Sequence, residues 1–425
     1  MGLLLDNCLV LAGQRLVPRQ VLIENGKIAE IAELDAKLPS MKRIDCGNKI
    51  LLPGAIDAHV HFRVPGAEHK EDWKTGSRAA IAGGVTTVID MPNNNPSCTT
   101  QELLDEKKKV AKKDSLCNFE FQFGASNENE TELRTVEGAV SFKVFMGSST
   151  GSLLVVDDKI LKEIFSVAKE RDAVVAVHAE DEEIIQEHIE SAKEIGWNHA
   201  RYHSKIRNNE AEAKAIEHAL QIQGGVGNKL HFCHVSTKKG LKLIKEAKEE
   251  DRSVTCEVTP HHLFLDDMAY EELGNFAKMN PPLRSKEDVQ ALWKGIADGT
   301  VDIIATDHAP HLREEKEKPY WGAPSGVPGI ETMLPLLFDA VNKEKISLQR
   351  VVELCCKNPA KIFGLESKGE LKRGKDADLI LIDLEKETTV KNGQLQTKCN
   401  WSPFATWKLK GHVEKVFVNA KEIKL

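Results

Sequence analysis

The sequence lacks any apolar run long enough to span a bilayer, which argues against a membrane-spanning protein. Its first residues, 1–13 (MGLLLDNCLVLAG), are apolar, but they lack the basic lead and the small-residue cleavage site of a signal peptide. We interpret this segment as a β-strand. The sequence therefore predicts a soluble, cytoplasmic protein with no membrane partner.

The sequence also has no excess of positive charge and no basic cluster. Its 58 Lys and Arg residues are outnumbered by 65 Asp and Glu residues, which gives a formal net charge of −7. The basic residues are scattered, and the run at 106–114 (EKKKVAKKD) is typical of the solvated face of a helix. This distribution argues against a nucleic-acid partner.

Cysteines are few and show no paired, zinc-like spacing. The chain has nine of them, which is an odd number in a long sequence. This usage predicts reduced thiols in a reducing compartment rather than a disulfide framework.

Both ends of the chain have the texture of short antiparallel strands. In 20–32 (QVLIENGKIAEIA), Asn25-Gly26 separates two β-rich runs, which predicts a tight hairpin. Residues 369–383 and 411–425 alternate apolar and polar residues in the same way. We expect residues 1–52 and 365–425 to pair into one small β-sandwich domain, with residues 53–364 as the main body.

The main body alternates short β-rich runs with polar, helix-favouring stretches such as 209–224 and 238–253. This alternation predicts an α/β fold of the (β/α)₈ TIM-barrel type. An open doubly wound sheet is the competing fold, but no glycine-rich dinucleotide fingerprint follows the first β-rich run. The β-rich runs are 55–62, 85–93, 119–126, 139–147, 173–181, 229–237, 254–262 and 301–311.

Polar residues collect where these predicted strands end, which is the face of a barrel that carries active sites. Asp57, His59, His61 and Arg63 are spaced two apart, so they share one face of an extended strand. The later strands end in a similar set of polar residues: Lys143, His178, His234, Asp307 and His311.

This set is chemically suited to a metal. His-x-His on a strand presents two imidazoles to one ion; the alternative is a polar pair bonded to water or backbone. His178 and His234, taken singly, could instead be satisfied core histidines. A buried Asp307 requires a cation to compensate it. Lys143 is either a neutral amine that reacts with CO₂ to give a carbamate, or a lysine paired with a carboxylate.

Several motifs give the chain its resemblance to the amidohydrolase superfamily, and within it to the dihydroorotase family. The most specific is D-x-H-x-H-F-R-x-P-G at 57–66. The resemblance covers essentially the whole chain and includes the two-part β domain. The further motifs are 91–93 (MPN), 142–151 (FKVFMGSSTG), 178–181 (HAED), 231–237 (HFCHVST), 279–284 (MNPPLR), 306–311 (TDHAPH), 326–332 (GVPGIET) and the tail from 358–365 to 378–383.

The resemblance implies a metal-dependent enzyme. Two Zn²⁺ ions with a hydroxide between them would form its metal centre. His59, His61 and Asp307 would hold one ion, His178 and His234 the other, and carboxylated Lys143 would bridge them. His231 is the alternative to His234, and we expect it to be structural. Cys233 and Glu257 are expected nearby, as a packed thiol and a supporting carboxylate.

The implied reaction is the reversible hydrolysis of L-dihydroorotate to N-carbamoyl-L-aspartate in de novo pyrimidine biosynthesis, with Asp307 as base and acid. The alternatives are an allantoinase or hydantoinase, and a non-catalytic scaffold that has lost its metals. A homodimer is plausible because symmetric pairs are common. The implied substrate contacts are Arg63, Asn93, Asn280, His311, Ser325 and Gly326, with Ser149 and Thr150 in a lid.

Overall fold

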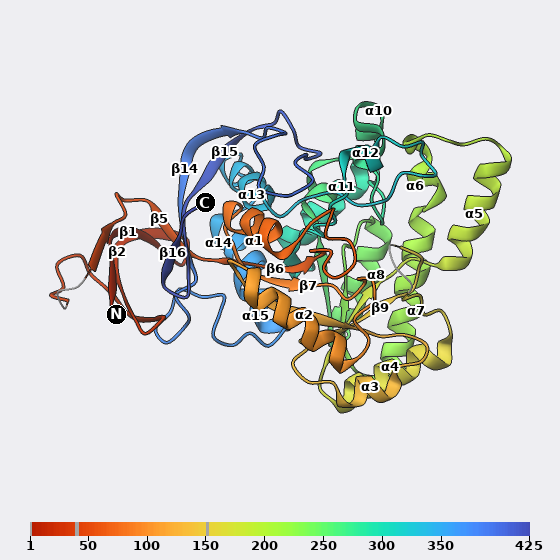
Figure 1. The fold of residues 1–425 in the computed structure, drawn as a ribbon, viewed down its shortest axis with the longest axis horizontal. Helices are drawn as coiled ribbons and strands as arrows, with labels where there is room; N and C mark the ends of the chain where they lie inside the picture. The colour runs from red at the N-terminus through yellow and green to blue at the C-terminus, as the bar shows by residue number, and fades with distance from the viewer. Residues whose placement is uncertain (1, 39–41, 150–152) are drawn as a thin grey trace.

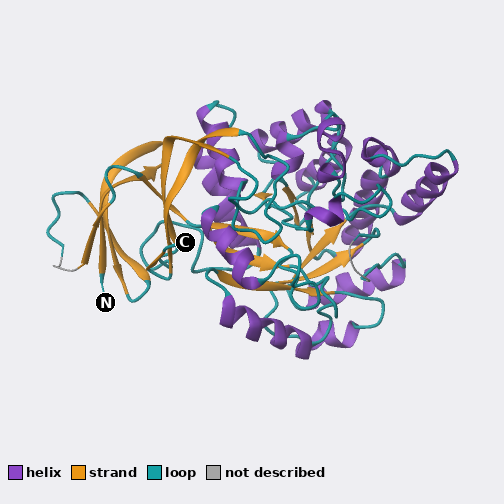
Figure 2. Cartoon of the chain, turned by 45° about the horizontal axis from the view of Figure 1, so that its top comes forward, coloured by secondary structure: helices purple, strands orange, loops and turns teal. Residues whose placement is uncertain are grey.

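The computed structural model describes residues 2–38, 42–149 and 153–425, and it contains two sheets with helices around one of them (Figures 1 and 2). The larger body is a barrel of parallel strands in sequence order from β6 to β13. The predicted (β/α)₈ barrel is confirmed. The barrel strands are β6 (Ala55–Val60), β7 (Val85–Asp90), β8 (Asn118–Gly124), β9 (Ser141–Phe145), β10 (Val174–His178), β11 (Lys229–Phe232), β12 (Val254–Val258) and β13 (Ile303–Ile304).

The barrel strands form because they are short apolar runs that both faces of a covered parallel sheet can bury. In β10, for example, every residue from Val174 to His178 is buried. The barrel closes between its first and last strands, where Val60 bridges to His308 and the His61 amide donates to the His308 carbonyl at 2.9 Å. This closure brings His59 and His61 next to the end of β13.

Helices surround the barrel and cover its outer face (Figure 2). The longer ones are α1 (Trp73–Ala82), α2 (Gln101–Asp114), α4 (Asp158–Glu170), α5 (Glu182–Glu194), α7 (Asn209–Val226), α8 (Lys238–Glu249), α11 (Lys286–Asp298) and α13 (Met333–Asn342). Shorter ones are α3 (Glu130–Thr135), α6 (His203–Ile206), α9 (Pro260–Phe264), α10 (Ala269–Leu273), α12 (Arg313–Lys316), α14 (Leu348–Val352) and α15 (Asn358–Ile362). None of these described helices is both long and apolar enough to cross a membrane.

The loops that follow β10 and β11 are fixed by the helices that begin after them. Asp181 caps α5 by accepting a hydrogen bond from the Ile184 amide, and Thr237 caps α8 by accepting one from the Gly240 amide. His178 therefore ends β10 where a capped connection begins, and His234 lies on the capped connection after β11.

The chain ends form the second sheet, in which the N-terminal and C-terminal strands lie side by side (Figure 1). The two ends join where β5 pairs antiparallel with β14, with Ile50 opposite Ile382. At the predicted hairpin, Asn25 and Gly26 both have positive φ, as a tight two-residue turn requires. The strands are β1 (Leu3–Ala12), β2 (Arg15–Glu24), β3 (Lys27–Ala32), β4 (Lys42–Asp45), β5 (Ile50–Pro53), β14 (Leu379–Thr389), β15 (Lys408–Val418) and β16 (Lys421–Ile423).

The connection between β14 and β15 leaves this sheet and packs against the barrel. Trp401 and Phe404 are buried in one apolar cluster with Met279 and Leu336 of the barrel body. The Trp401 indole N–H donates to the carbonyl of His311 at 2.8 Å. This C-terminal segment therefore supports a loop that carries a predicted substrate contact.

Candidate functional site

Three predicted ligands meet between β6 and β13. The Oδ1 atom of Asp307 lies 2.9 Å from His61 Nε2 and 3.3 Å from His59 Nε2. All three side chains are buried. On its other side, His61 Nδ1 lies 2.8 Å from the amide oxygen of Asn93, which fixes the ring orientation. His59 of the first strand, His61 just after it and Asp307 after the last strand therefore present donor atoms to one point.

The second predicted pair meets beside the first group. His178 Nδ1 lies 3.0 Å from His234 Nε2, and both rings are buried. The His234 ring centroid is 5.3 Å from that of His59. Donor atoms of His59, His234 and Asp307 all lie within 4.8 Å of one another. The two groups are thus adjacent parts of a single cluster.

Backbone strain accompanies this cluster. Arg63, His234 and Asp307 all have positive φ, at 64°, 35° and 45°. Non-glycine residues rarely adopt such values, and strain of this kind concentrates at functional sites. For Arg63 this corrects the sequence interpretation, because β6 ends at Val60 and Arg63 lies beyond the strand rather than on its face.

Lys143 is buried in the middle of β9 and projects toward the same cluster. Its ammonium donates to Cys233 Sγ at 2.8 Å and lies 5.0 Å from the centroid of the Phe145 ring. In the part of the chain that the structure describes, no ion pair joins Lys143 to a carboxylate. The paired-lysine alternative therefore finds no support.

The charges in the cluster favour a bound cation. Burial lowers the pKa of His61 to about 4, and burial likewise lowers the pKa values of His178 and His234, so these imidazoles stay neutral with a lone pair available. Burial acts the same way on His59, but the carboxylates of Glu257 and Asp307 outweigh it and raise the His59 pKa to about 10. Two buried carboxylates thus require positive charge at this point.

These donors fit a metal ion. Imidazole nitrogens and a carboxylate oxygen are the ligands that zinc prefers, and they converge here in a dry site. Among the described residues, the buried His234 Nδ1 atom has no hydrogen-bond partner. A buried imidazole pair such as His178 and His234 is satisfied by a cation held between its facing nitrogens.

Glu257 of β12 lies behind His59. Its carboxylate is 2.5 Å from His59 Nδ1 and 3.1 Å from His231 Nε2. His231 also contacts Thr255 Oγ1 at 2.8 Å through its other ring nitrogen, Nδ1. His59, Cys233 and Glu257 form a further group of donor atoms within 4.8 Å of one another. Glu257 thereby holds two histidines from different strands.

The predicted substrate contacts form a second polar region next to the cluster. Arg63 and His311 are both buried, and Arg63 Nη2 lies 3.2 Å from His311 Nε2. Arg63 Nε also donates to the Pro310 carbonyl at 3.2 Å. A guanidinium held in this way is suited to a carboxylate ligand.

Asn280 and the loop at 325–326 are held by hydrogen bonds to neighbouring segments. The Asn280 amide oxygen lies 3.0 Å from His203 Nε2. The Gly326 amide donates to the Lys278 carbonyl, and the Gly326 carbonyl accepts from Lys316, both at 2.9 Å. Gly326 has φ of 139°, and a Cβ there would lie 2.5 Å from the Ala309 carbonyl oxygen. Only glycine fits this corner, and its contact with a substrate ring stays a prediction.

The remaining predicted residues are those of the lid, Ser149 and Thr150. Ser149 is partly buried in the loop after β9, and Thr150 lies outside the described residues. The sequence analysis missed Lys70, whose ammonium lies 3.2 Å from His311 Nδ1 and 3.0 Å from Glu315. It also missed Glu180 and Arg207, although Glu180 stands only two residues after His178 in the HAED motif.

Comparisons with known proteins agree with this architecture. The sequence family described as "Amidohydrolase family" matches residues 50–423. The chain is 40% identical over 410 residues to a dihydroorotase of Methanosarcina mazei, covering 94% of this chain and 89% of that protein. It is 42% identical over 365 residues to a dihydroorotase of Halobacterium salinarum, covering 85% and 82%. Among solved structures, the L-hydantoinase (dihydropyrimidinase) of Arthrobacter aurescens superimposes with a TM-score of 0.96 at 33% identity, covering 99% of this chain and 95% of that one.

Proposed function

Because this chain belongs to the amidohydrolase family, we propose that it catalyses the reversible hydrolysis of L-dihydroorotate to N-carbamoyl-L-aspartate in pyrimidine biosynthesis. The observation that carries this proposal is the buried pair of Arg63 and His311 beside the histidine cluster. A ring substrate that bears a carboxylate matches a buried guanidinium next to a hydrolytic centre. The names of the sequence relatives support the same substrate.

We propose the metal ligands that the family resemblance implies, and the distances within the cluster support them. His59, His61 and Asp307 would hold one Zn²⁺ ion, and His178 and His234 would hold a second. Lys143, once its amine has combined with CO₂, would supply two oxygen ligands between them. When bound, the two ions would lower the pKa of a water molecule between them and polarise the ring carbonyl of the substrate.

The protein's own residues would orient the substrate and move one proton. Arg63 and His311 would fix the carboxylate, which places the ring amide over the cluster. Asp307 would accept the proton of the attacking water as the new C–O bond forms. The same carboxyl group would then donate that proton to the ring nitrogen as the C–N bond breaks. In the biosynthetic direction these transfers run in reverse.

A hydantoinase or allantoinase activity is the alternative, and the close superposition on the L-hydantoinase structure favours it. The two activities differ in the substrate rather than in the cluster. Hydantoin and allantoin carry no carboxylate on the ring for Arg63 to bind, so a buried Arg63 favours dihydroorotate.

The purified protein should be assayed with dihydroorotate, allantoin and a 5-substituted hydantoin under the same conditions. We expect kcat/KM to be largest for dihydroorotate, and a preference for either other ring would overturn the proposal. Elemental analysis of the same sample tests the non-catalytic alternative, because a scaffold that has lost its metals would contain no zinc. We also propose a cytoplasmic homodimer, which light scattering of the purified protein tests.

A further inference from the structure

A buried ion pair lies directly behind His178. The Glu180 carboxylate is 2.9 Å from His178 Nε2, on the opposite side of the ring from His234. The Arg207 guanidinium donates to the same carboxylate, with Nη2 to Oε2 at 2.5 Å and Nε to both oxygens at 3.1 Å. Arg207 Nη2 also donates to the Ser148 carbonyl at 2.8 Å. Glu180 is therefore fixed from two sides.

A second buried acid holds the loop after His234. The Glu212 carboxylate accepts hydrogen bonds from the Thr237 amide at 2.9 Å, the Thr237 hydroxyl at 2.7 Å and the Ser236 amide at 3.1 Å. Its partner cation is Arg284, whose Nη2 atom lies 3.8 Å away and whose Nε donates to Ser236 Oγ at 3.0 Å.

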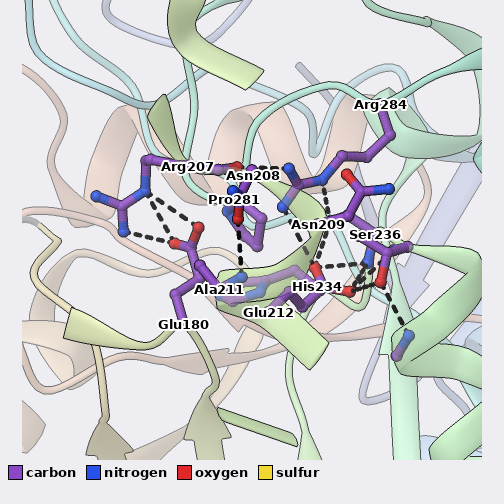
Figure 3. A network of polar contacts seen from close by, with 12 residues as sticks. Glu180, Arg207, Asn208, Asn209, Ala211, Glu212, His234, Ser236, Pro281 and Arg284 are labelled. Carbon is purple, nitrogen blue, oxygen red and sulfur yellow. Dashed lines mark hydrogen bonds and ion pairs between the residues drawn. The ribbon is translucent and has the colours of Figure 1, made fainter. Parts of the chain in front are cut away.

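The two pairs are joined into one network. Arg284 Nη1 donates to the backbone carbonyl of Arg207 at 2.5 Å, so the two arginines connect the two acids (Figure 3). Glu180, Arg207, Glu212 and Arg284 are all buried, and their charges balance. Removing one member leaves its partner charged and buried, which destabilises the folded protein.

This network reaches both ligands proposed for the second ion and neither histidine of the first. Glu180 contacts the His178 ring, and Glu212 holds the backbone immediately after His234. His59 and His61 are supported by Glu257 and Asn93, and Glu257 also accepts a hydrogen bond from the His234 amide at 3.2 Å. The contact of Glu180 with the His178 ring is therefore the support that belongs to the second position alone.

We propose that Glu180, held by Arg207, is a positioning residue that sets the affinity of the second metal position alone. This inference rests on the two-ion site proposed above. The negative charge of Glu180, 2.9 Å from His178 Nε2, favours the proton on that nitrogen, which leaves the Nδ1 lone pair facing His234 Nε2. Carboxylate support of this kind orients a ligating imidazole and raises its basicity. Its loss typically weakens metal binding by about 10–100-fold.

The test is a Co²⁺ titration of the full-length chain after chelator treatment, in the presence of bicarbonate and followed by visible absorption. Wild-type protein should show two binding steps, and His178→Asn identifies the step that belongs to the second position. In Glu180→Gln we expect that step to weaken about 10–100-fold while the other stays unchanged. Glu257→Gln should weaken the other step, because Glu257 lies 2.5 Å from His59 Nδ1.

Glu183→Gln is the matched control, because it makes the same chemical change on an exposed side chain three residues away from Glu180. It should leave both steps unchanged. Should Glu180→Gln fail to fold, the double variant Glu180→Gln/Arg207→Met removes the unpaired guanidinium and carries the same expectation. Two steps at wild-type affinity, or equal weakening of both, would overturn the proposal in either variant. Because Co²⁺ binding needs no substrate, an inactive wild type with two normal steps would contradict only the proposed function.

Discussion

Arg63 Nη2 and His311 Nε2 lie 3.2 Å apart, although 248 positions separate the two residues in the sequence. Lys70 approaches the other ring nitrogen of His311 at 3.2 Å. Burial, reinforced by the positive charge of Arg63, lowers the His311 pKa to about 3, so the ring is neutral. Glu315 pairs with Lys70 at 3.0 Å, so Arg63 supplies the unpaired positive charge of this region. An anionic substrate would bind side chains that are already buried and fixed in position.

Replacing Arg63 with Met should weaken catalysis of dihydroorotate through binding of its carboxylate. A hydrogen bond to a charged group contributes about 1.5–3 kcal/mol, so kcat/KM should fall about 10–100-fold, mainly through KM. Steady-state kinetics measure this, and metal content should not change. Arg313→Met is the control, since Arg313 is a half-exposed arginine two residues after His311. An unchanged KM in Arg63→Met would exclude Arg63 from substrate binding.

Replacing Asp307 with Asn should leave a folded protein with very low turnover. Asparagine has nearly the same shape, but it cannot accept and return the proton, so kcat should fall by about 10²–10⁴-fold. Circular dichroism and elemental analysis of the same sample separate this loss from unfolding and from loss of metal. Asp298→Asn, on the surface at the end of α11, should behave like the wild type. Turnover near the wild-type value would remove Asp307 from proton transfer.

Lys143 should carry a carbamate when the protein is loaded with zinc in bicarbonate. With ¹³C-labelled bicarbonate, the wild type should give one carbamate signal in the ¹³C NMR spectrum, and Lys143→Ala should give none. Lys107 provides an internal control: it is also buried, but Asp90 lies 2.6 Å away and keeps it paired. A signal that persists in Lys143→Ala would place the modification on another lysine.

The sequence predicted the barrel and the cluster well because both depend on local patterns. Each β-rich run of the main body became a strand, and the histidines stand where those strands end. Arg63 was placed wrongly, because alternation in 57–63 does not reveal that the strand bends away after Val60, where it meets His308. Local patterns therefore fail where the barrel closes.

Buried charged side chains were the other feature that local patterns did not reveal. Lys107 stands in the basic run at 106–114, yet it is buried and paired with Asp90 of β7. Arg207 looks like any surface arginine in the sequence, and its role depends on Glu180, 27 positions earlier. Such pairs are fixed by how elements pack, so the sequence alone cannot distinguish them from solvated charges.

His203 should make the stability of the protein fall in mild acid. Its Nε2 atom lies 2.9 Å from the Met279 carbonyl, and its Nδ1 atom lies 2.9 Å from the Tyr320 hydroxyl. Burial, together with the positive charges of Lys278 and Arg207, lowers the His203 pKa to about 3, against about 6.5 in an unfolded chain. The unfolded state then binds the proton more tightly. The contribution of neutral His203 is complete above pH 6.5 and is lost as the pH falls toward 3, by roughly 1 kcal/mol per pH unit.

His203→Gln removes this titration, so the stability difference between wild type and variant should shrink by roughly 1 kcal/mol between pH 7.5 and pH 5.5. Urea unfolding at the two pH values measures it. His218→Gln, a partly exposed histidine of α7, serves as the control and should not show a difference of this size. If the wild type and His203→Gln lose stability in parallel over this range, the His203 pKa is the same in the folded and unfolded protein. Burial beside Lys278 and Arg207 would then not hold this ring in its neutral form.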